Sequence, residues 1–178
     1  ETIVYLFSPK DKPSGDAKTM LDIALASSGT TGEAAQKGTV ICAYDPSFSW
    51  EALTETVSTS HLIVDALLGT GLSHPVHGVY VQAIETINHL RSAFHIPVVS
   101  VDIPSGVSAD TGEVLGAAVQ ANYTFTMGLP KRGLFLGEGL ERRGQWDVID
   151  IGFPKELVDQ ENIAIDLIGH SDLRPAFL

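Results

Sequence analysis

Solid apolar runs, separated by polar and glycine-rich segments, dominate the hydrophobic pattern of this chain. Runs of this kind are typical of strands buried on both faces, whereas apolar residues at a spacing of three to four predict helices. The predicted strands are Thr2–Phe7, Thr39–Tyr44, Leu62–Leu68, Pro97–Ile103, Ala121–Met127 and Gln145–Ile151. The predicted helices are Ala17–Ala26, Trp50–Val57 and Val79–Leu90. The pattern leaves Ile163–Ile168 open between a last strand and part of a tail.

The alternation of these strands and helices predicts an α/β fold with a mostly parallel sheet that helices cover on both faces. We therefore expect a three-layer αβα sandwich of Rossmann-like type. No internal repeat is visible, and no linker precedes residue 155. The chain is interpreted as one domain over residues 1–155, followed by a tail or connector over residues 156–178.

The composition of the chain indicates in which cellular compartment the protein works and which classes of partner it lacks. The 178 residues carry a formal net charge of −11, so the basic footprint of a nucleic-acid-binding protein is missing and we expect no nucleic-acid partner. Cys42 is the single cysteine, which excludes a disulfide framework and fits a reducing, cytoplasmic compartment. No apolar stretch approaches the length of a membrane span, so no membrane partner is expected.

Two acids mark the ends of apolar strands. Asp65 lies inside the run Leu62–Leu68, just before Gly69 and Gly71, and a buried carboxylate without partners is costly. It should therefore face a cation, a donor cluster or a polar ligand. The glycines let a backbone come close to a ligand, although they could equally make a sharp strand-to-loop turn.

Asp102 ends the next apolar strand, ahead of Pro104, Ser105 and Gly106. Ligands of parallel sheets bind beyond the carboxyl ends of the strands, where both acids are expected to converge. An acid at this edge is a reasonable general acid or base, and the alternative is an Asp that caps its own turn. Ser105 lies outside a G-x-S-x-G elbow, which disfavours a nucleophilic hydrolase.

The distribution of basic residues suggests a counterion for these acids. Arg91 is the only Lys or Arg between Gly38 and Pro130, so a cation held by Asp65 would supply the missing charge; hydrogen bonds to amides and hydroxyls are the alternative. Lys131 and Arg132 follow a strand end, where they could approach a phosphate or lie in a solvated turn. His74 and His77 are interpreted as surface-loop histidines rather than metal ligands.

Several long motifs together resemble the YjeF N-terminal domain family, whose enzymatic members are NAD(P)H-hydrate epimerases. They are DALLGTGLSHPVHG, VVSVDIPSGVSADTGEVLGAAVQANYTFTMGLPKRGLFLG and WDVIDIGFP, with KPSGDA nearer the start of the chain. The resemblance implies an isomerase that interconverts the R and S epimers of hydrated NADH and NADPH for nicotinamide nucleotide repair. It also implies a potassium ion as cofactor.

By the same resemblance, Asp102 contacts the substrate, and we assign it the proton transfer; the potassium ligands fall on Asp65 and Ser105. The loop that binds the substrate is implied to comprise Gly69, Thr70, Gly71, Leu72, Ser73, His74 and Pro75. Two chemical routes stay open, which are loss and re-addition of the hydroxyl and opening of the ring.

The sequence departs from the family pattern at its start. Family members carry an Asn/Gly/Asp-rich loop ahead of the point where Glu1 falls, so we expect an N-terminally incomplete domain that is doubtful as an independent catalyst. At the other end, GHSDLRPAFL resembles the connector to an ADP- or ATP-dependent dehydratase domain. A fused dehydratase and a homo-oligomer are therefore among the partners considered. The alternative function is a non-catalytic binding or scaffold module with the same fold.

Overall fold

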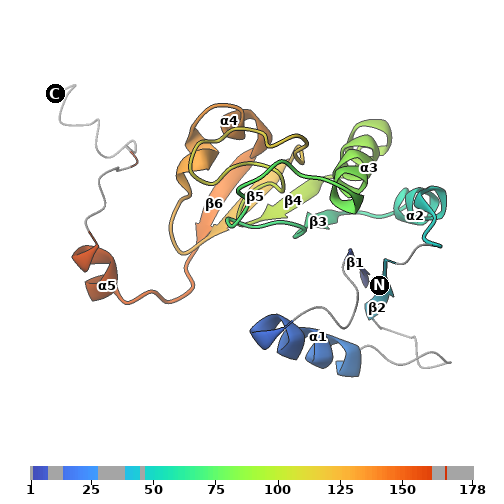
Figure 1. Cartoon of the computed structure of the whole chain (residues 1–178), viewed down its shortest axis with the longest axis horizontal. Coiled ribbons are helices and arrows are strands. Elements are labelled where there is room, and N and C mark those ends of the chain that lie inside the picture. The colour runs from blue at the N-terminus through green and yellow to red at the C-terminus, as the bar shows by residue number, and fades with distance from the viewer. Residues whose placement is uncertain (1, 8–13, 28–38, 45–46, 162–166, 168–178) are drawn as a thin grey trace.

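The computed structural model describes residues 2–7, 14–27, 39–44, 47–161 and 167 (Figure 1). Every strand pair among the described residues is parallel. The first pair joins β1 (Thr2–Leu6) to β2 (Thr39–Ala43). The second sheet has the order β3 (Ile63–Asp65), β4 (Val98–Val101), β5 (Tyr123–Met127) and β6 (Gln145–Ile149).

Helices occupy every connection between consecutive strands of the described residues except the one from β4 to β5, which is a loop without a helix. The long ones are α1 (Gly15–Ser27), α2 (Trp50–Val57) and α3 (Val79–Phe94). The short ones are a 3₁₀ turn η1 (Arg132–Phe135), α4 (Gly139–Arg142) and α5 (Lys155–Gln160). The expected α/β fold, a parallel sheet with flanking helices, is confirmed.

The predicted elements exist with shifted bounds. The run Leu62–Leu68 shortens to β3 because Leu67 and Leu68 leave the strand and pack against the core around Ile84 and Val98. Helix α3 continues past Leu90 to Phe94 and ends at His95, whose φ of 56° breaks the helix. The segment Ile163–Ile168 lies outside the described residues except for Leu167, and the division at residue 155 stays a prediction.

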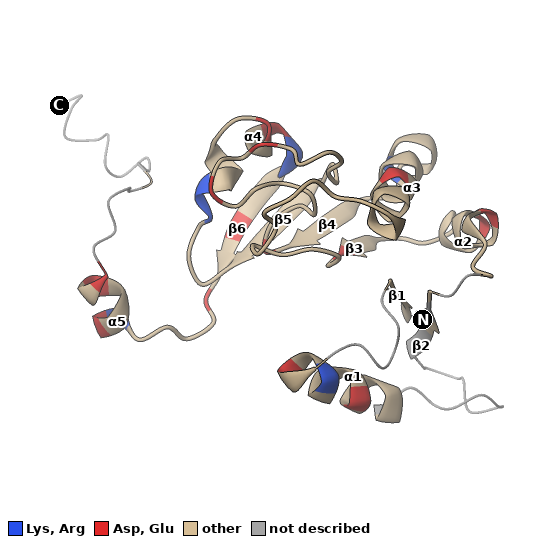
Figure 2. Cartoon of the chain, in the orientation of Figure 1, with Lys and Arg blue, Asp and Glu red and all other residues tan. Residues whose placement is uncertain are grey.

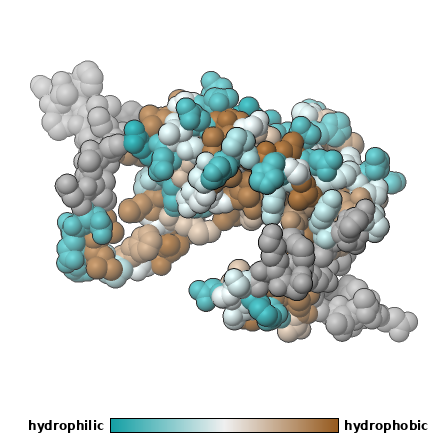
Figure 3. Space-filling view, viewed as in Figure 1, coloured by the Kyte–Doolittle hydropathy of each residue, from teal (hydrophilic) through white to brown (hydrophobic). Residues whose placement is uncertain are grey.

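The two faces of the β3–β6 sheet differ in their surroundings. On one face, Val98 of β4 packs against Ile84 of α3 and Val119 in a fully buried cluster. The opposite face carries exposed apolar side chains, among them Tyr123, Phe125, Met127, Ile149 and Val64. In Figure 3, apolar surface (brown) lies along the lower side of the part of the molecule that contains the β3–β6 sheet. The buried core therefore lies between α3, the sheet and the loops that follow β3 and β4.

The β1–β2 pair is a sheet of its own rather than an extension of the second sheet. Its carboxyl end contacts the start of α2 through aromatic rings, with Phe7 stacked on Trp50 at 5.6 Å between centroids. Phe48 packs edge-on against both rings. This aromatic cluster links the first sheet to the part of the chain that carries the site.

No helix of the described residues is long and apolar enough to cross a membrane. Basic residues are few and scattered over the molecule, whereas acidic residues lie on most of the helices (Figure 2). The described surface therefore carries no basic stripe of the kind that tracks a phosphate backbone.

Candidate functional site

The two predicted site acids lie at one edge of the β3–β6 sheet. Asp65 is the last residue of β3, and Asp102 directly follows β4. Because β3 and β4 are neighbours and parallel, with Asp65 opposite Ser100, their carboxyl ends open onto the same edge. The fold therefore brings together the two segments that the sequence singled out.

Asp65 is buried and fully engaged by hydrogen-bond donors. Its Oδ2 accepts hydrogen bonds from Ser100 Oγ at 2.8 Å and from the Ser105 amide at 2.9 Å. Its Oδ1 accepts a bond from Ser105 Oγ at 2.6 Å and a longer one from the Leu67 amide at 3.4 Å. With 1% of its surface exposed, the carboxylate has the donor cluster that its burial requires. Of the three partners expected for it, the structure therefore places a donor cluster against Asp65.

These hydrogen bonds bear on the predicted potassium ligands. Carboxylate and hydroxyl oxygens are the class of ligand that hard cations take. Asp65 and Ser105 do lie together, yet they bind each other, and the four donors fill the acceptor sites of the carboxylate. In this arrangement the two residues do not fit a potassium ion, and the ion stays a prediction from the family resemblance.

Ser105 also anchors the loop that follows β3. Its Oγ accepts a hydrogen bond from the Leu68 amide at 2.9 Å, immediately before Gly69. At the far end of the loop, the Val76 amide donates to the carbonyl of Leu115, and the Val76 side chain is buried in the core. The predicted substrate loop Gly69–Pro75 is therefore a mostly exposed span held at both ends.

The glycines of this loop are not demanded by its conformation. Neither Gly69 nor Gly71 has a positive φ, and a Cβ on either residue would meet no atom within 4 Å. The space beside them is open, which favours the ligand-approach interpretation over the sharp-turn interpretation. His74 and His77 are exposed and bond within the loop, to Ser73 Oγ and to the carbonyl of Pro75. Among the described residues no cluster of His, Cys, Asp and Glu could hold a metal.

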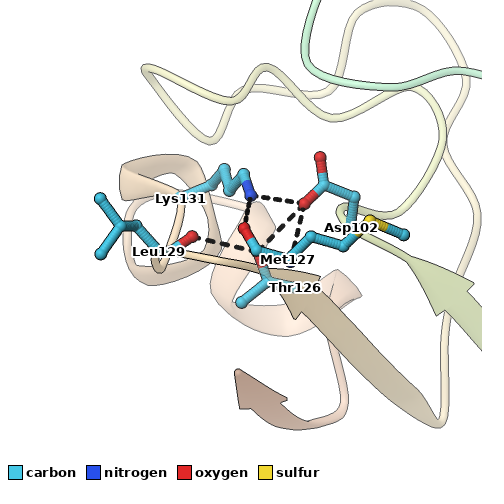
Figure 4. Close-up of polar contacts among 5 residues, drawn as sticks. All are labelled: Asp102, Thr126, Met127, Leu129 and Lys131. Carbon is cyan, nitrogen blue, oxygen red and sulfur yellow. Dashed lines mark hydrogen bonds and ion pairs between the residues drawn. The ribbon is translucent and has the colours of Figure 1, made fainter. Parts of the chain in front are cut away.

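Asp102 adopts a left-handed backbone conformation, with a φ of 71°. Its amide donates to the carbonyl of Phe125 in the neighbouring strand at 2.8 Å. Its Oδ1 accepts hydrogen bonds from the Met127 amide at 3.0 Å and from Thr126 Oγ1 at 3.3 Å (Figure 4). Asp102 therefore does not cap its own turn, because the end of β5 supplies the donors.

Lys131 completes this group. Its Nζ lies 2.5 Å from Asp102 Oδ1 and donates to the carbonyl of Met127 at 2.6 Å. The expectation that both acids lack a nearby basic side chain is therefore wrong for Asp102. Leu129 and Pro130 turn the chain back at the end of β5, and this turn returns Lys131 to the edge where Asp102 lies.

A signal for this pair was present in the sequence. Lys131 is the first basic residue after Arg91, and it follows a strand end by four positions. Strand ends of a parallel sheet meet at one edge, so a cation there is a candidate partner for an acid at a neighbouring strand end. What the sequence does not reveal is that β5 lies beside β4, and this neighbourhood creates the contact.

Comparison with known proteins identifies related sequences. A family model described as "YjeF-related protein N-terminus" matches residues 1–133. The bifunctional NAD(P)H-hydrate repair enzyme Nnr of Thermofilum pendens is 47% identical over 116 residues, which are 65% of this chain and 21% of that protein. The NAD(P)H-hydrate epimerase of Weissella koreensis is 45% identical over 98 residues, which are 54% of this chain and 42% of that protein.

The chain thus spans less than half the length of either relative. Among solved structures, the crystal structure of yeast YNL200c superposes with a TM-score of 0.64 at 16% sequence identity. The superposition covers 94% of this chain and 61% of the yeast chain. At this identity the likeness concerns the fold alone.

Proposed function

We propose that this chain forms the core of an NAD(P)H-hydrate epimerase. The chain belongs to the family of YjeF-related protein N-termini, and this membership is the first support for the proposal. The substrate would be hydrated NADH or NADPH, and the reaction would interconvert its R and S epimers. Relatives named for this activity, or for the bifunctional repair enzyme, support the proposal. So does the geometry around Asp102, which is the single observation that carries the chemistry.

The reaction needs a group that can take and return a proton. The carbon that epimerises bears a hydroxyl group beside the ring nitrogen. It inverts either through loss and re-addition of the hydroxyl or through opening of the ring. Both routes move a proton on or off the oxygen, and a carboxylate within hydrogen-bond reach of that oxygen can do so. We assign this step to Asp102.

Substrate binding is assigned to the loop Gly69–Pro75. Its exposed backbone and the open space beside Gly69 and Gly71 would let main-chain amides approach an anionic ligand. This mode of binding suits a chain whose net charge is −11, because it needs no basic side chains.

Replacing Asp102 with Asn in the intact protein tests the proposal. We expect the enzymatic acceleration of epimer exchange, followed by NMR or by chromatographic separation of the epimers, to fall at least about 100-fold. Asp159→Asn, on the exposed face of α5, is the matched control and should keep the wild-type rate. Normal exchange by Asp102→Asn would remove Asp102 from the mechanism.

A binding module without catalysis gives a different result. It would bind the hydrate in a calorimetric titration, yet both wild type and Asp102→Asn would leave the exchange at its spontaneous rate. That result would replace the epimerase proposal with the scaffold alternative.

The potassium ion is a separate part of the proposal. It would require the Ser105 hydroxyl to turn from Asp65 toward the carbonyl of Leu68, which lies 3.2 Å from Ser105 Oγ. That turn would remove the shortest hydrogen bond of Asp65 Oδ1 and leave it only the longer one from the Leu67 amide, so that one acceptor site of this oxygen becomes available. Titration with potassium chloride should then raise the melting temperature of the protein more than titration with lithium chloride. Equal effects of the two salts would exclude a specific site.

We propose that a fused or separate dehydratase is the partner of this protein in the repair of hydrated NADH and NADPH. Its support is the word "bifunctional" in the name of the Thermofilum relative. An enzyme that equilibrates two epimers supplies substrate to one that consumes a single epimer. In coupled assays with an ADP- or ATP-dependent dehydratase, the second epimer should be consumed faster than its spontaneous exchange allows only when the wild-type protein is present.

A further inference from the structure

We propose that Lys131 is a positioning residue for Asp102, which holds one carboxylate oxygen in place and leaves the other to the substrate. The inference rests on the proposed epimerase function and adds a residue to the site. It begins from the ion pair at the end of β5, where Lys131 Nζ lies 2.5 Å from Asp102 Oδ1 (Figure 4).

The ammonium group of Lys131 is itself fixed by two acceptors. Besides Asp102 Oδ1, it contacts the carbonyl oxygen of Met127 at 2.6 Å, and this carbonyl belongs to the end of β5. The lysine side chain is 20% exposed and the Asp102 side chain 21% exposed, so the pair is largely shielded from water. A flexible surface lysine would not be restricted in this way.

The donors of the described residues that reach the Asp102 carboxylate all converge on the same oxygen. Oδ1 accepts from the Met127 amide and from Thr126 Oγ1, and it pairs with Lys131 Nζ. Within the described part of the chain, Oδ2 has no hydrogen-bond partner. The carboxylate is thus held on one side and open on the other, which is the asymmetry that a proton-transfer group needs.

Lys131 differs from the other two donors in charge and in origin. The Met127 amide and the Thr126 hydroxyl belong to β5 itself, whereas Lys131 reaches back from the turn after the strand. A charge-assisted hydrogen bond is stronger than a neutral one, so it fixes the carboxylate more firmly than the two neutral donors alone. Two protein acceptors engage two of the three N–H donors of the ammonium group, so the protein fixes its position without a ligand.

The test uses the intact protein and three substitutions. Lys131→Met keeps an unbranched apolar stem and removes the ammonium group with its charge, whereas Lys131→Arg keeps the charge. Lys155→Met removes an exposed lysine from α5, outside the site, and is the control. Each variant is assayed for kcat and KM in the epimer exchange and for its melting temperature.

We expect Lys131→Met to lower kcat by about 10- to 100-fold while KM stays close to wild type, because a misplaced proton-transfer group slows chemistry without weakening binding. Lys131→Arg should recover most of kcat, and Lys155→Met should match wild type. A rise in KM at constant kcat would show that Lys131 binds the substrate and would overturn the proposal. Unchanged kcat in a folded Lys131→Met variant would also overturn it.

A crystal structure of Lys131→Met gives a readout that does not depend on turnover. We expect the Asp102 carboxylate to leave the Met127 amide or to occupy two orientations. A carboxylate that stays in place would show that Thr126 and Met127 suffice, and would overturn the positioning role. If the wild-type protein fails to accelerate exchange, the epimerase proposal falls, whereas this structural comparison still decides the role of Lys131.

Discussion

Asp102 occupies a left-handed backbone conformation, with a φ of 71°, at the point where β4 ends. Residues without a short polar side chain lose roughly 1–2 kcal/mol in this conformation, whereas Asn and Asp tolerate it and Gly adopts it freely. The same residue also supplies the acceptor for the Met127 amide. Backbone conformation and side-chain chemistry therefore restrict this position together.

These two contributions can be separated by measuring the free energy of unfolding in urea. Asp102→Ala should lower it by about 2 kcal/mol, because it meets the left-handed penalty and also loses the acceptor. Asp102→Gly avoids the backbone penalty and should be more stable than Asp102→Ala, and Asp102→Asn should be the mildest of the three. Equal stability of the Ala and Gly variants would show that the backbone conformation costs nothing here.

Asp65 is a second residue whose role can be tested by stability alone. Removing its carboxylate leaves the Ser100 hydroxyl and the Ser105 amide without their acceptor in a buried place, whereas the Ser105 hydroxyl keeps the carbonyl of Leu68. We expect Asp65→Ala to lower the free energy of unfolding by about 3 kcal/mol or more. Asp159→Ala, on the exposed α5, should change it by less than about 0.5 kcal/mol. Similar values for the two variants would contradict the hydrogen-bonding network.

At the scale of an element, the turn after Asp102 is packed much more closely than the loop after Asp65. Gly106 has a φ of 95°, and a Cβ on it would lie 1.9 Å from the carbonyl oxygen of Ala117. A Cβ on Gly71 would meet no atom within 4 Å. The first glycine is demanded by the fold, and the second is free to serve a ligand.

Alanine should therefore affect the stability of the protein at Gly106 and the binding of the substrate at Gly71. Gly106→Ala is expected to lower the free energy of unfolding by about 3 kcal/mol or to prevent folding, because backbone atoms must move. Gly71→Ala should leave the melting temperature unchanged and raise KM for the hydrate by severalfold. A Gly71→Ala variant with wild-type KM would argue against backbone approach of the substrate at this residue.

At the scale of the molecule, burial is uneven along the chain. The buried hydrophobic residues of the described chain all lie between Leu53 and Leu134, whereas α1 exposes Met20 and Ile23. Regions with few buried apolar contacts open at low free energy. The β3–β6 part should accordingly be the last to unfold.

Hydrogen exchange followed by mass spectrometry measures this difference. We expect amides of β4 and β5 to exchange slowest and those of α1, β1 and β2 to exchange faster by at least about 100-fold. Peptides from α5 serve as an exposed reference. Uniform protection of all the strands would show that the two sheets unfold as one unit.

The order of strands and helices was predictable because solid apolar runs indicate the strands of a parallel sheet, and the fold class follows from their alternation with helices. The expected cover on both faces was not found among the described residues, since one face of the β3–β6 sheet exposes apolar side chains. The positions of Asp65 and Asp102 at one edge followed from the same rule. The hydrogen-bond and ion-pair partners of these acids could not be predicted in this way. Lys131 reaches Asp102 only because β5 pairs with β4. The strand end at Asp65 was placed too late, since side-chain hydrogen bonds and core packing ended the strand against its apolar pattern.

The loop Gly69–Pro75 is held at both of its ends, by the Leu68 amide on Ser105 and by Val76 in the core. Its ends therefore stay in place whatever lies between them. Residues inserted there would enlarge the loop at a small entropic cost, because loop closure depends only weakly on length. If this loop binds the substrate as proposed, exchange of a few of its residues would change the binding preference while Asp102 and its supporting strands keep their positions.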